Sequence, residues 1–99
     1  MQPGRASLSL ITNEQGGIKD DTIVTKVQDN DYFVVVNGAC KDADFKHINE
    51  VKAAKFSGKD VNISFIEDHS LIAVQGPKTQ KIMEELLGIS LNDQEFMTS

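Results

Sequence analysis

Two adjacent carboxylates open a stretch of the sequence that favours β-structure. Asp20 and Asp21 follow the Gly-Gly pair at residues 16–17 and precede a run rich in β-branched residues. Asp is disfavoured in strands and like charges repel, so this placement is poor for stability. Because side chains alternate along a strand, Asp20 and Asp21 are expected on opposite faces, and one of them can point into a pocket. The alternative is that both cap the preceding turn.

Asn37 is a second candidate, because it directly follows the apolar run at residues 32–36. A side-chain amide at the end of a buried strand can give a donor and an acceptor to a heterocyclic ring, while the strand supplies apolar walls. Asn-Gly is also a common tight-turn pair. Taken alone, residues 37–38 therefore favour a structural turn.

Other polar groups give weaker signals. Residues 72–77 run from a strand through Gly76 towards a helix, but they lack the glycine spacing of a phosphate loop. Residues 67–69 have no accompanying nucleophile pattern and are interpreted as a solvated loop. His47 and His69 lie far apart without partners at ligand spacing, and Cys40 is the single cysteine. We therefore expect neither a metal site nor an internal disulfide.

The composition is that of one globular domain at most, with 99 residues, 39% hydrophobic and 25% charged. The net charge is −5 and the basic residues are scattered, so nucleic acid is not an expected partner. No apolar run approaches the roughly 18 residues of a membrane helix, so no membrane partner is expected either. The N-terminal residues show neither a signal peptide nor a mitochondrial presequence.

The elements that must position these groups begin with three strands. Residues 7–12, 18–27 and 32–36 have strand patterns separated by turn residues. The third is apolar on both faces and is expected to be central. A helix is predicted over residues 42–56, with Asp42 or a neighbour as cap and Gly58 at its end. Its apolar face, expected to pack on the sheet, consists of Phe45, Ile48, Val51 and Ala54.

The second half predicts a hairpin of strands over residues 61–66 and 71–74, followed by a helix with Pro77 in its first turn and Gly88 at its end. Leu91 and Phe96 are expected packing anchors. The order of elements indicates an α+β fold, with helices packed on a mainly antiparallel sheet. The first strand is expected to leave an unpaired sheet edge.

Four segments together resemble the T-protein family of the glycine cleavage system, the aminomethyltransferases. They are residues 8–14, 16–25, 34–44 and 71–77, in order and at matching separations. The resemblance implies that residues 1–99 are part of the folate-binding domain of an internal fragment whose flanking domains are absent. Ala6 and the order Gly38-Ala39 depart from the usual family pattern, so the local backbone is expected to differ slightly.

The resemblance also assigns residues. Asp21 corresponds to the family's functional carboxylate at the folate, and Leu8, Val35 and Asn37 correspond to pocket positions beside it. A fixed carboxylate in a poorly hydrated pocket would stabilise the cationic species of methylene transfer, or take a proton from the folate nitrogen. Asp20, on the other face, is expected to be structural.

For the whole protein, the resemblance implies transfer of an aminomethyl group from the lipoyl arm of the H-protein to tetrahydrofolate. Ammonia is released and 5,10-methylenetetrahydrofolate is formed. The Asn-Glu pair at residues 13–14, Cys40 and residues 96–99 are similar to the eukaryotic, mitochondrial branch. The isolated chain is expected to bind folate weakly, to be inactive, and to self-associate through surfaces left open.

Two alternatives remain open at this point. One is the folate-binding domain of a sarcosine or dimethylglycine dehydrogenase, which resembles the T-protein around residues 16–21 and would be fused to a flavin domain. The other is a folate-binding scaffold without catalysis. The paired Asp residues speak against a pure scaffold, which has no need of an inward carboxylate.

Overall fold

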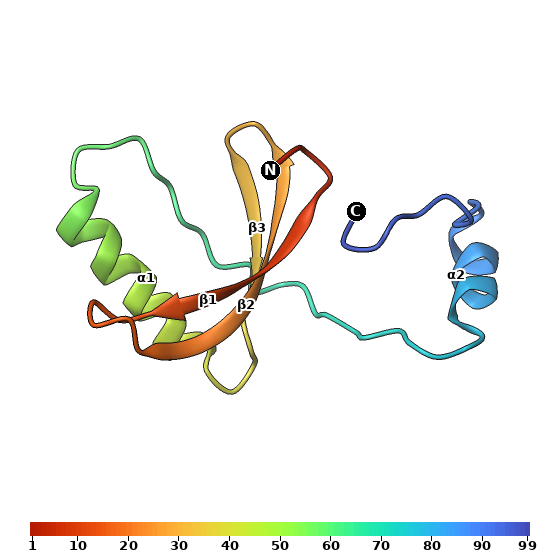
Figure 1. Ribbon diagram of the computed structural model, residues 1–99, viewed down its shortest axis with the longest axis horizontal. Coiled ribbons are helices and arrows are strands. Elements are labelled where there is room, and N and C mark those ends of the chain that lie inside the picture. The colour runs from red at the N-terminus through yellow and green to blue at the C-terminus, as the bar shows by residue number, and fades with distance from the viewer. The chain divides into compact units, whose positions relative to one another are not determined.

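The computed structural model describes all 99 residues as two compact units, one of residues 1–65 with 97–99 and one of residues 66–96. The first unit holds strands β1 (Ala6–Thr12), β2 (Ile18–Gln28) and β3 (Asp31–Val35) with helix α1 (Lys41–Lys55), and the second holds helix α2 (Thr79–Leu87) (Figure 1). The predicted α+β class is confirmed. No helix has the length and apolar character needed to cross a membrane.

The three strands form one antiparallel sheet in the order β1-β2-β3. All three predicted strands are confirmed, but the third is not central: β2 is, and β3 is an edge. Consecutive strands joined by short turns pair with their neighbours in the chain, so the second of three lies in the middle. The apolar side chains of β3 are largely uncovered, with Tyr32 52% and Val34 42% exposed.

Asn13 organises the turn between β1 and β2. Its Oδ1 accepts hydrogen bonds from the backbone N–H of Gly17 at 2.7 Å and of Gln15 at 3.1 Å. Gly16 has a φ of +81°, which L side chains rarely adopt, and a Cβ on Gly17 would lie 2.8 Å from Asn13 Nδ2. The turn is therefore capped by Asn13, and the alternative in which the two Asp residues cap it is wrong.

Helix α1 agrees with its prediction to within one residue at each end. Asp42 and Asp44 lie in its first turn and Lys52 and Lys55 in its last, as the helix dipole favours. The expected side-chain cap is wrong: the N-cap is Cys40, no side chain caps the helix, and the Cys40 carbonyl accepts the N–H of Asp44 at 2.9 Å. Phe56 forms the C-cap, rather than Gly58.

Side-chain contacts hold α1 against the β1–β2 hairpin. His47 Nε2 lies 3.0 Å from the carbonyl oxygen of Thr12, and Lys55 Nζ lies 3.3 Å from Glu14 Oε1. Phe45 packs edge-to-face on Phe65, with ring centroids 5.4 Å apart. On the predicted apolar face, Phe45, Ile48 and Val51 are half-buried, whereas Ala54 is exposed.

The predicted strands at residues 61–66 and 71–74 are wrong, because neither segment joins a β-ladder. A β-prone sequence becomes a strand only when its N–H and C=O groups find a partner strand, and local propensity does not supply one. The apolar side chains of the second segment remain exposed, with Leu71 at 70% and Ile72 at 82%.

In the second unit, α2 begins after its predicted start. Lys78 is the N-cap, so Pro77 precedes the helix instead of occupying its first turn. Gly88 ends the helix as predicted, with a φ of 68° and its N–H donating to the Glu84 carbonyl at 2.9 Å. Leu91 is half-buried, but Phe96 is 91% exposed and is not the anchor that was expected.

No apolar side chain of the chain is fully buried. The two buried side chains are polar: Thr22, 6% exposed, and Asp44, 2% exposed. Thr22 donates its hydroxyl hydrogen to the Val35 carbonyl at 2.6 Å, which links β2 to β3. The best-enclosed point of the structure therefore lies beside the acidic pair of β2.

Candidate functional site

The strand register places three of the expected site residues on one face of the sheet. Leu8 pairs with Ile23, and Ile23 pairs with Val35, while Leu10 pairs with Asp21. Directly paired residues of antiparallel strands point to the same side. We call this side the open face; its residues are Ala6, Leu8, Leu10, Asp21, Ile23, Thr25, Phe33 and Val35.

The open face is apolar and uncovered around Asp21. Leu8 is 67% exposed, Leu10 is 50% and Ile23 is 38%. Asp21 is itself exposed and is the one charged residue among the eight. A carboxylate surrounded by flat, apolar strand residues can meet a planar ligand that carries a donor or a positive charge at its edge.

Asn37 lies beyond the end of β3, where the next residue pair with Asp21 would fall. Its Nδ2 donates to Asp21 Oδ1 at 2.9 Å and to Asp20 Oδ1 at 2.9 Å, and lies 3.5 Å from the Asp21 carbonyl oxygen. The Asn37 carbonyl also accepts the N–H of Cys40 at 3.0 Å, which closes a turn. Asn37 is thus both the turn residue and a partner of the two carboxylates.

Asp20 points to the face that meets α1 and is half-buried. Its Oδ1 accepts the N–H of Asp21 at 3.0 Å in addition to the Asn37 amide. The Asn37 hydrogen bond is the main cause that holds the pKa of the Asp20 carboxyl below its ordinary value. Asp20 is therefore the carboxylate that these hydrogen bonds keep ionised.

Asp44 of α1 lies against Asp20 and was not predicted from the sequence as a site residue. Burial, followed by the hydrogen-bonding and charge interactions with Asp20, raises the pKa of the Asp44 carboxyl. The Asp20 carboxylate also raises the pKa of the Cys40 thiol. The signal was present in the sequence, because Asp44 precedes Ile48 by four residues and Val51 by seven and so belongs to the inward stripe of the helix.

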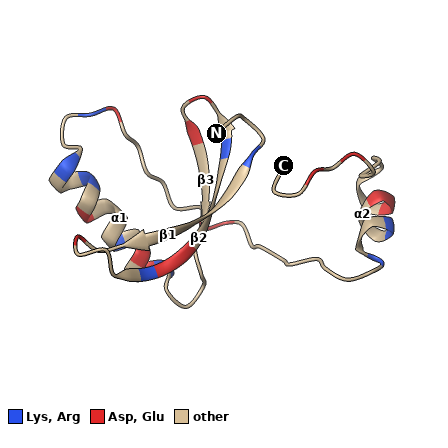
Figure 2. Ribbon diagram, viewed as in Figure 1, with Lys and Arg blue, Asp and Glu red and all other residues tan.

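The charge distribution supports this placement. Figure 2 shows the acidic stretch at the beginning of β2, in red, next to the first turns of α1. Asp68 and His69, by contrast, form a 2.8 Å pair that is 86% and 77% exposed at its side chains. That pair is the solvated loop expected from the sequence.

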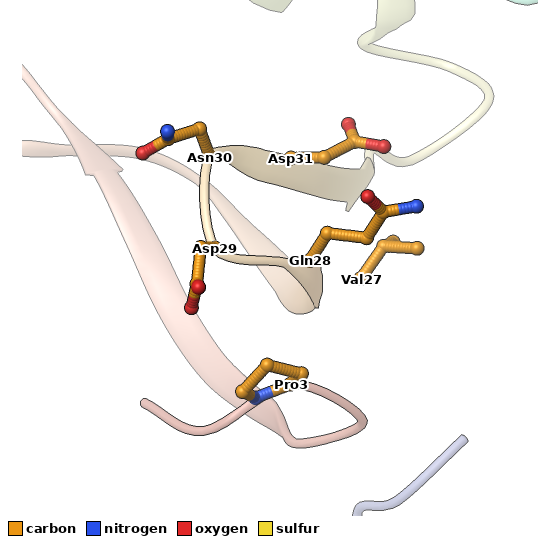
Figure 3. Close-up of a pocket in the computed structure, with 6 residues that line it drawn as sticks. All are labelled: Pro3, Val27, Gln28, Asp29, Asn30 and Asp31. Carbon is orange, nitrogen blue, oxygen red and sulfur yellow. The ribbon is translucent and has the colours of Figure 1, made fainter.

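A hollow of about 490 Å³ lies elsewhere, at the turn between β2 and β3 (Figure 3). Its lining consists of Pro3, Val27, Gln28, Asp29, Asn30 and Asp31. None of the expected site residues lines it, and Asp29 is engaged with Lys26 at 3.3 Å. The open face with its carboxylate is therefore the better candidate for chemistry.

The fold and the site define an α+β domain that presents a fixed carboxylate on an open sheet face. The chain belongs to the GCVT N-terminal domain family, which it matches over residues 1–99. The resemblance to the T-protein family is confirmed by the relatives.

Among these, the mitochondrial aminomethyltransferase of Dictyostelium discoideum is 45% identical over 100 residues, which cover 96% of this chain and 24% of that protein. The mitochondrial aminomethyltransferase of Flaveria pringlei is 40% identical over 97 residues, covering 97% and 24%. The probable mitochondrial aminomethyltransferase of Schizosaccharomyces pombe is 37% identical over 91 residues, covering 88% and 22%. The chain thus spans about a quarter of the length of these relatives. No solved structure matches it.

Proposed function

We propose that residues 1–99 are part of the folate-binding domain of a tetrahydrofolate-dependent aminomethyltransferase of glycine cleavage. The observation that supports this most directly is the register, which gathers Leu8, Asp21 and Val35 on one open face with Asn37 at its edge. These are the positions that the family resemblance assigns to the folate pocket. The relatives carry aminomethyltransferase names, which supports a transferase over a flavin-linked dehydrogenase or a scaffold.

The residues present fit a reduced folate in two respects. Leu8, Ile23 and Val35 form a row of apolar side chains across the three strands, suited to the face of a planar ring. Asp21 supplies an acceptor for ring N–H groups. Because the NH₂ group of Asn37 is taken up by the two carboxylates, the amide oxygen is the part of Asn37 that is left to accept from a ligand.

Tetrahydrofolate would supply the nucleophilic nitrogen that receives the one-carbon unit. Asp21 has two roles within reach: its carboxylate stabilises positive charge that develops beside it, and it can accept a proton. Both roles need a carboxylate held in one orientation, and the 2.9 Å hydrogen bond from Asn37 provides that restraint.

The partners and the compartment follow the same proposal. The donor is the aminomethyl-lipoyl arm of the H-protein, ammonia is released, and 5,10-methylenetetrahydrofolate is the product. The relatives are named mitochondrial, so we infer the same compartment. Residues 1–99 by themselves, about a quarter of those relatives in length, are expected to be inactive.

The experiment is reconstitution of the full-length protein with aminomethylated, lipoylated H-protein and tetrahydrofolate. We expect ammonia and 5,10-methylenetetrahydrofolate in equal amounts, each dependent on folate. Glycine-independent oxidation of sarcosine with flavin reduction would instead support a dehydrogenase. Folate binding without any transfer would support a scaffold.

A further inference from the structure

The most enclosed ionisable group in the chain is Asp44, and nothing in the proposed reaction uses it. Its side chain is 2% exposed, although α1 as a whole is a surface helix without any other buried residue. Its Oδ2 atom is buried without a hydrogen-bond partner, and the Oδ2 atom of Asp20 is in the same condition. Buried carboxylate oxygens without partners are costly, so this arrangement needs a physical explanation.

One proton shared between the carboxyl groups of Asp20 and Asp44 gives both of these Oδ2 atoms a hydrogen-bond partner. The carboxyl groups of Asp20 and Asp44 are close enough for each to affect the pKa of the other, and both Oδ2 atoms are buried without a partner. Two adjacent carboxylates repel, but a carboxyl group that keeps its proton donates an O–H to a carboxylate and satisfies both. We propose that Asp44 is a positioning residue: it shares a proton with Asp20, ties the first turn of α1 to β2, and through Asn37 holds the Asp21 carboxylate in place.

The surroundings decide which partner keeps the proton. Asp20 accepts the Asn37 amide and the Asp21 N–H, and both favour its charged form. Asp44 is the more enclosed of the two, so burial favours its neutral form. Coulombic interactions with Lys19 of β2 and His47 of α1 lower the pKa of Asp44, but more weakly than burial and Asp20 raise it. The other ionisable groups beside the pair are Cys40 and Asp21. The proton therefore belongs to Asp44.

With the proposed Asp44–Asp20 hydrogen bond, the link continues to Asp21 through the Asn37 amide. Asp44 fixes one oxygen of Asp20, and Asp20 Oδ1 accepts one hydrogen of the Asn37 amide. The second hydrogen of that amide goes to Asp21 Oδ1 at 2.9 Å. Without Asp44, the Asp20 carboxylate is free to rotate toward solvent, and Asn37 loses the acceptor that orients its other N–H.

The pair is expected to work within a pH window. Asp20 has a lowered folded pKa, so its contribution to stability is present above the ordinary value of 3.8 and is lost as the pH falls through the folded pKa. Asp44 has a raised folded pKa, so its contribution is present below 3.8 and is lost as the pH rises through that pKa. The shared proton is most stable between the two, in an interval that includes pH 3.8.

The test is a titration of the side-chain carboxyl ¹³C resonances of this 99-residue chain by NMR, in the original chain and in Asp44→Asn, Asp44→Ala and Asp42→Ala. In the original chain we expect one of the pair to titrate above 3.8 and the other below it. Asp44→Asn keeps a hydrogen-bond donor towards Asp20, so the pKa of Asp20 should stay below its ordinary value and the Asn37 side-chain NH₂ resonances should not shift.

In Asp44→Ala, the Asn37 NH₂ and Asp21 carboxyl resonances should shift toward the values of a freely rotating side chain. Asp42→Ala removes an exposed carboxyl group from the same helical turn and should leave those resonances unmoved. The proposal is overturned if Asp20 and Asp44 both titrate near 3.8 in the original chain, or if Asp44→Ala and Asp42→Ala give the same spectrum around Asn37. No folate is present in this experiment, so it stands or fails separately from the proposed reaction.

Discussion

The side-chain amide of Asn37 lies 2.9 Å from Asp21 Oδ1, two residues beyond the end of β3, at the position that would have paired with Asp21 if the strand had continued. Since β3 ends at Val35, the side chain of Asn37 takes the place of a backbone partner. The carboxylate on the open face is thus held from the strand end and remains exposed towards a ligand.

Asn37→Leu should destabilise the chain relative to the original chain, and this loss of stability should be larger near neutral pH than at acidic pH. The Asn37 hydrogen bond is the main cause of the lowered Asp20 pKa, and a lowered carboxyl pKa stabilises the fold above 3.8 and not below the folded pKa. Urea unfolding at pH 6 and pH 2 measures this: the difference in midpoint should be clear at pH 6 and smaller at pH 2. Equal differences would show that Asn37 does not act through Asp20.

Asn13→Ala should destabilise the β1–β2 hairpin by about 1 kcal/mol, because the backbone N–H groups of Gln15 and Gly17 lose their side-chain acceptor. Asn30→Ala, in the other hairpin turn, is the matched control. Hydrogen exchange of the β1–β2 amides should rise in Asn13→Ala alone. Unchanged exchange would mean that the two glycines shape this turn without Asn13.

Ile48→Ala tests the packing of α1. Because Ile48 is half-buried, we expect a loss of about 1–2 kcal/mol, less than the roughly 2–5 kcal/mol of a fully buried site. Glu50→Ala, on the exposed side of the same helix, should change stability by less than about 0.5 kcal/mol. Equal effects of the two variants in thermal unfolding would show that the Ile48 face is not packed.

The open face should make the chain self-associate as its concentration rises. Leu8→Glu places a charge on that face, whereas Ser9→Glu adds the same charge to the opposite side of β1. Sedimentation velocity over a range of concentrations should show association of the original chain and of Ser9→Glu, and a monomer for Leu8→Glu. A monomeric original chain at every concentration would contradict the prediction.

The sequence predicted those parts of the fold that depend on local pattern. Strand alternation placed Asp20 and Asp21 on opposite faces, and the recurrence of Phe45, Ile48 and Val51 gave α1. The prediction that residues 32–36 form the central strand was wrong. An apolar pattern shows that a strand can be covered on both faces, but it does not show that a second neighbouring strand is present.

The same reason explains the errors at residues 61–66 and 71–74, where β-propensity has no partner strand. Within the site, Asn37 was predicted as either a turn residue or a pocket residue, and it closes a turn while binding the carboxylates. Asp44 was not singled out from the sequence, because its role depends on Asp20, which lies 24 residues earlier and meets it only in the folded chain.

The most direct test of the central claim, that Asp21 is the functional carboxylate of the open face, is turnover of the full-length enzyme carrying Asp21→Asn. We expect turnover to fall at least about a hundredfold, as for loss of a positioned acid–base or electrostatic group, with a smaller loss of folate affinity. Asp31→Asn, which changes an exposed carboxylate at the start of β3, should leave turnover unchanged, and Asp20→Asn should act mainly on stability. If Asp20→Asn abolished turnover while Asp21→Asn left it intact, the assignment of Asp21 to the reaction would be wrong.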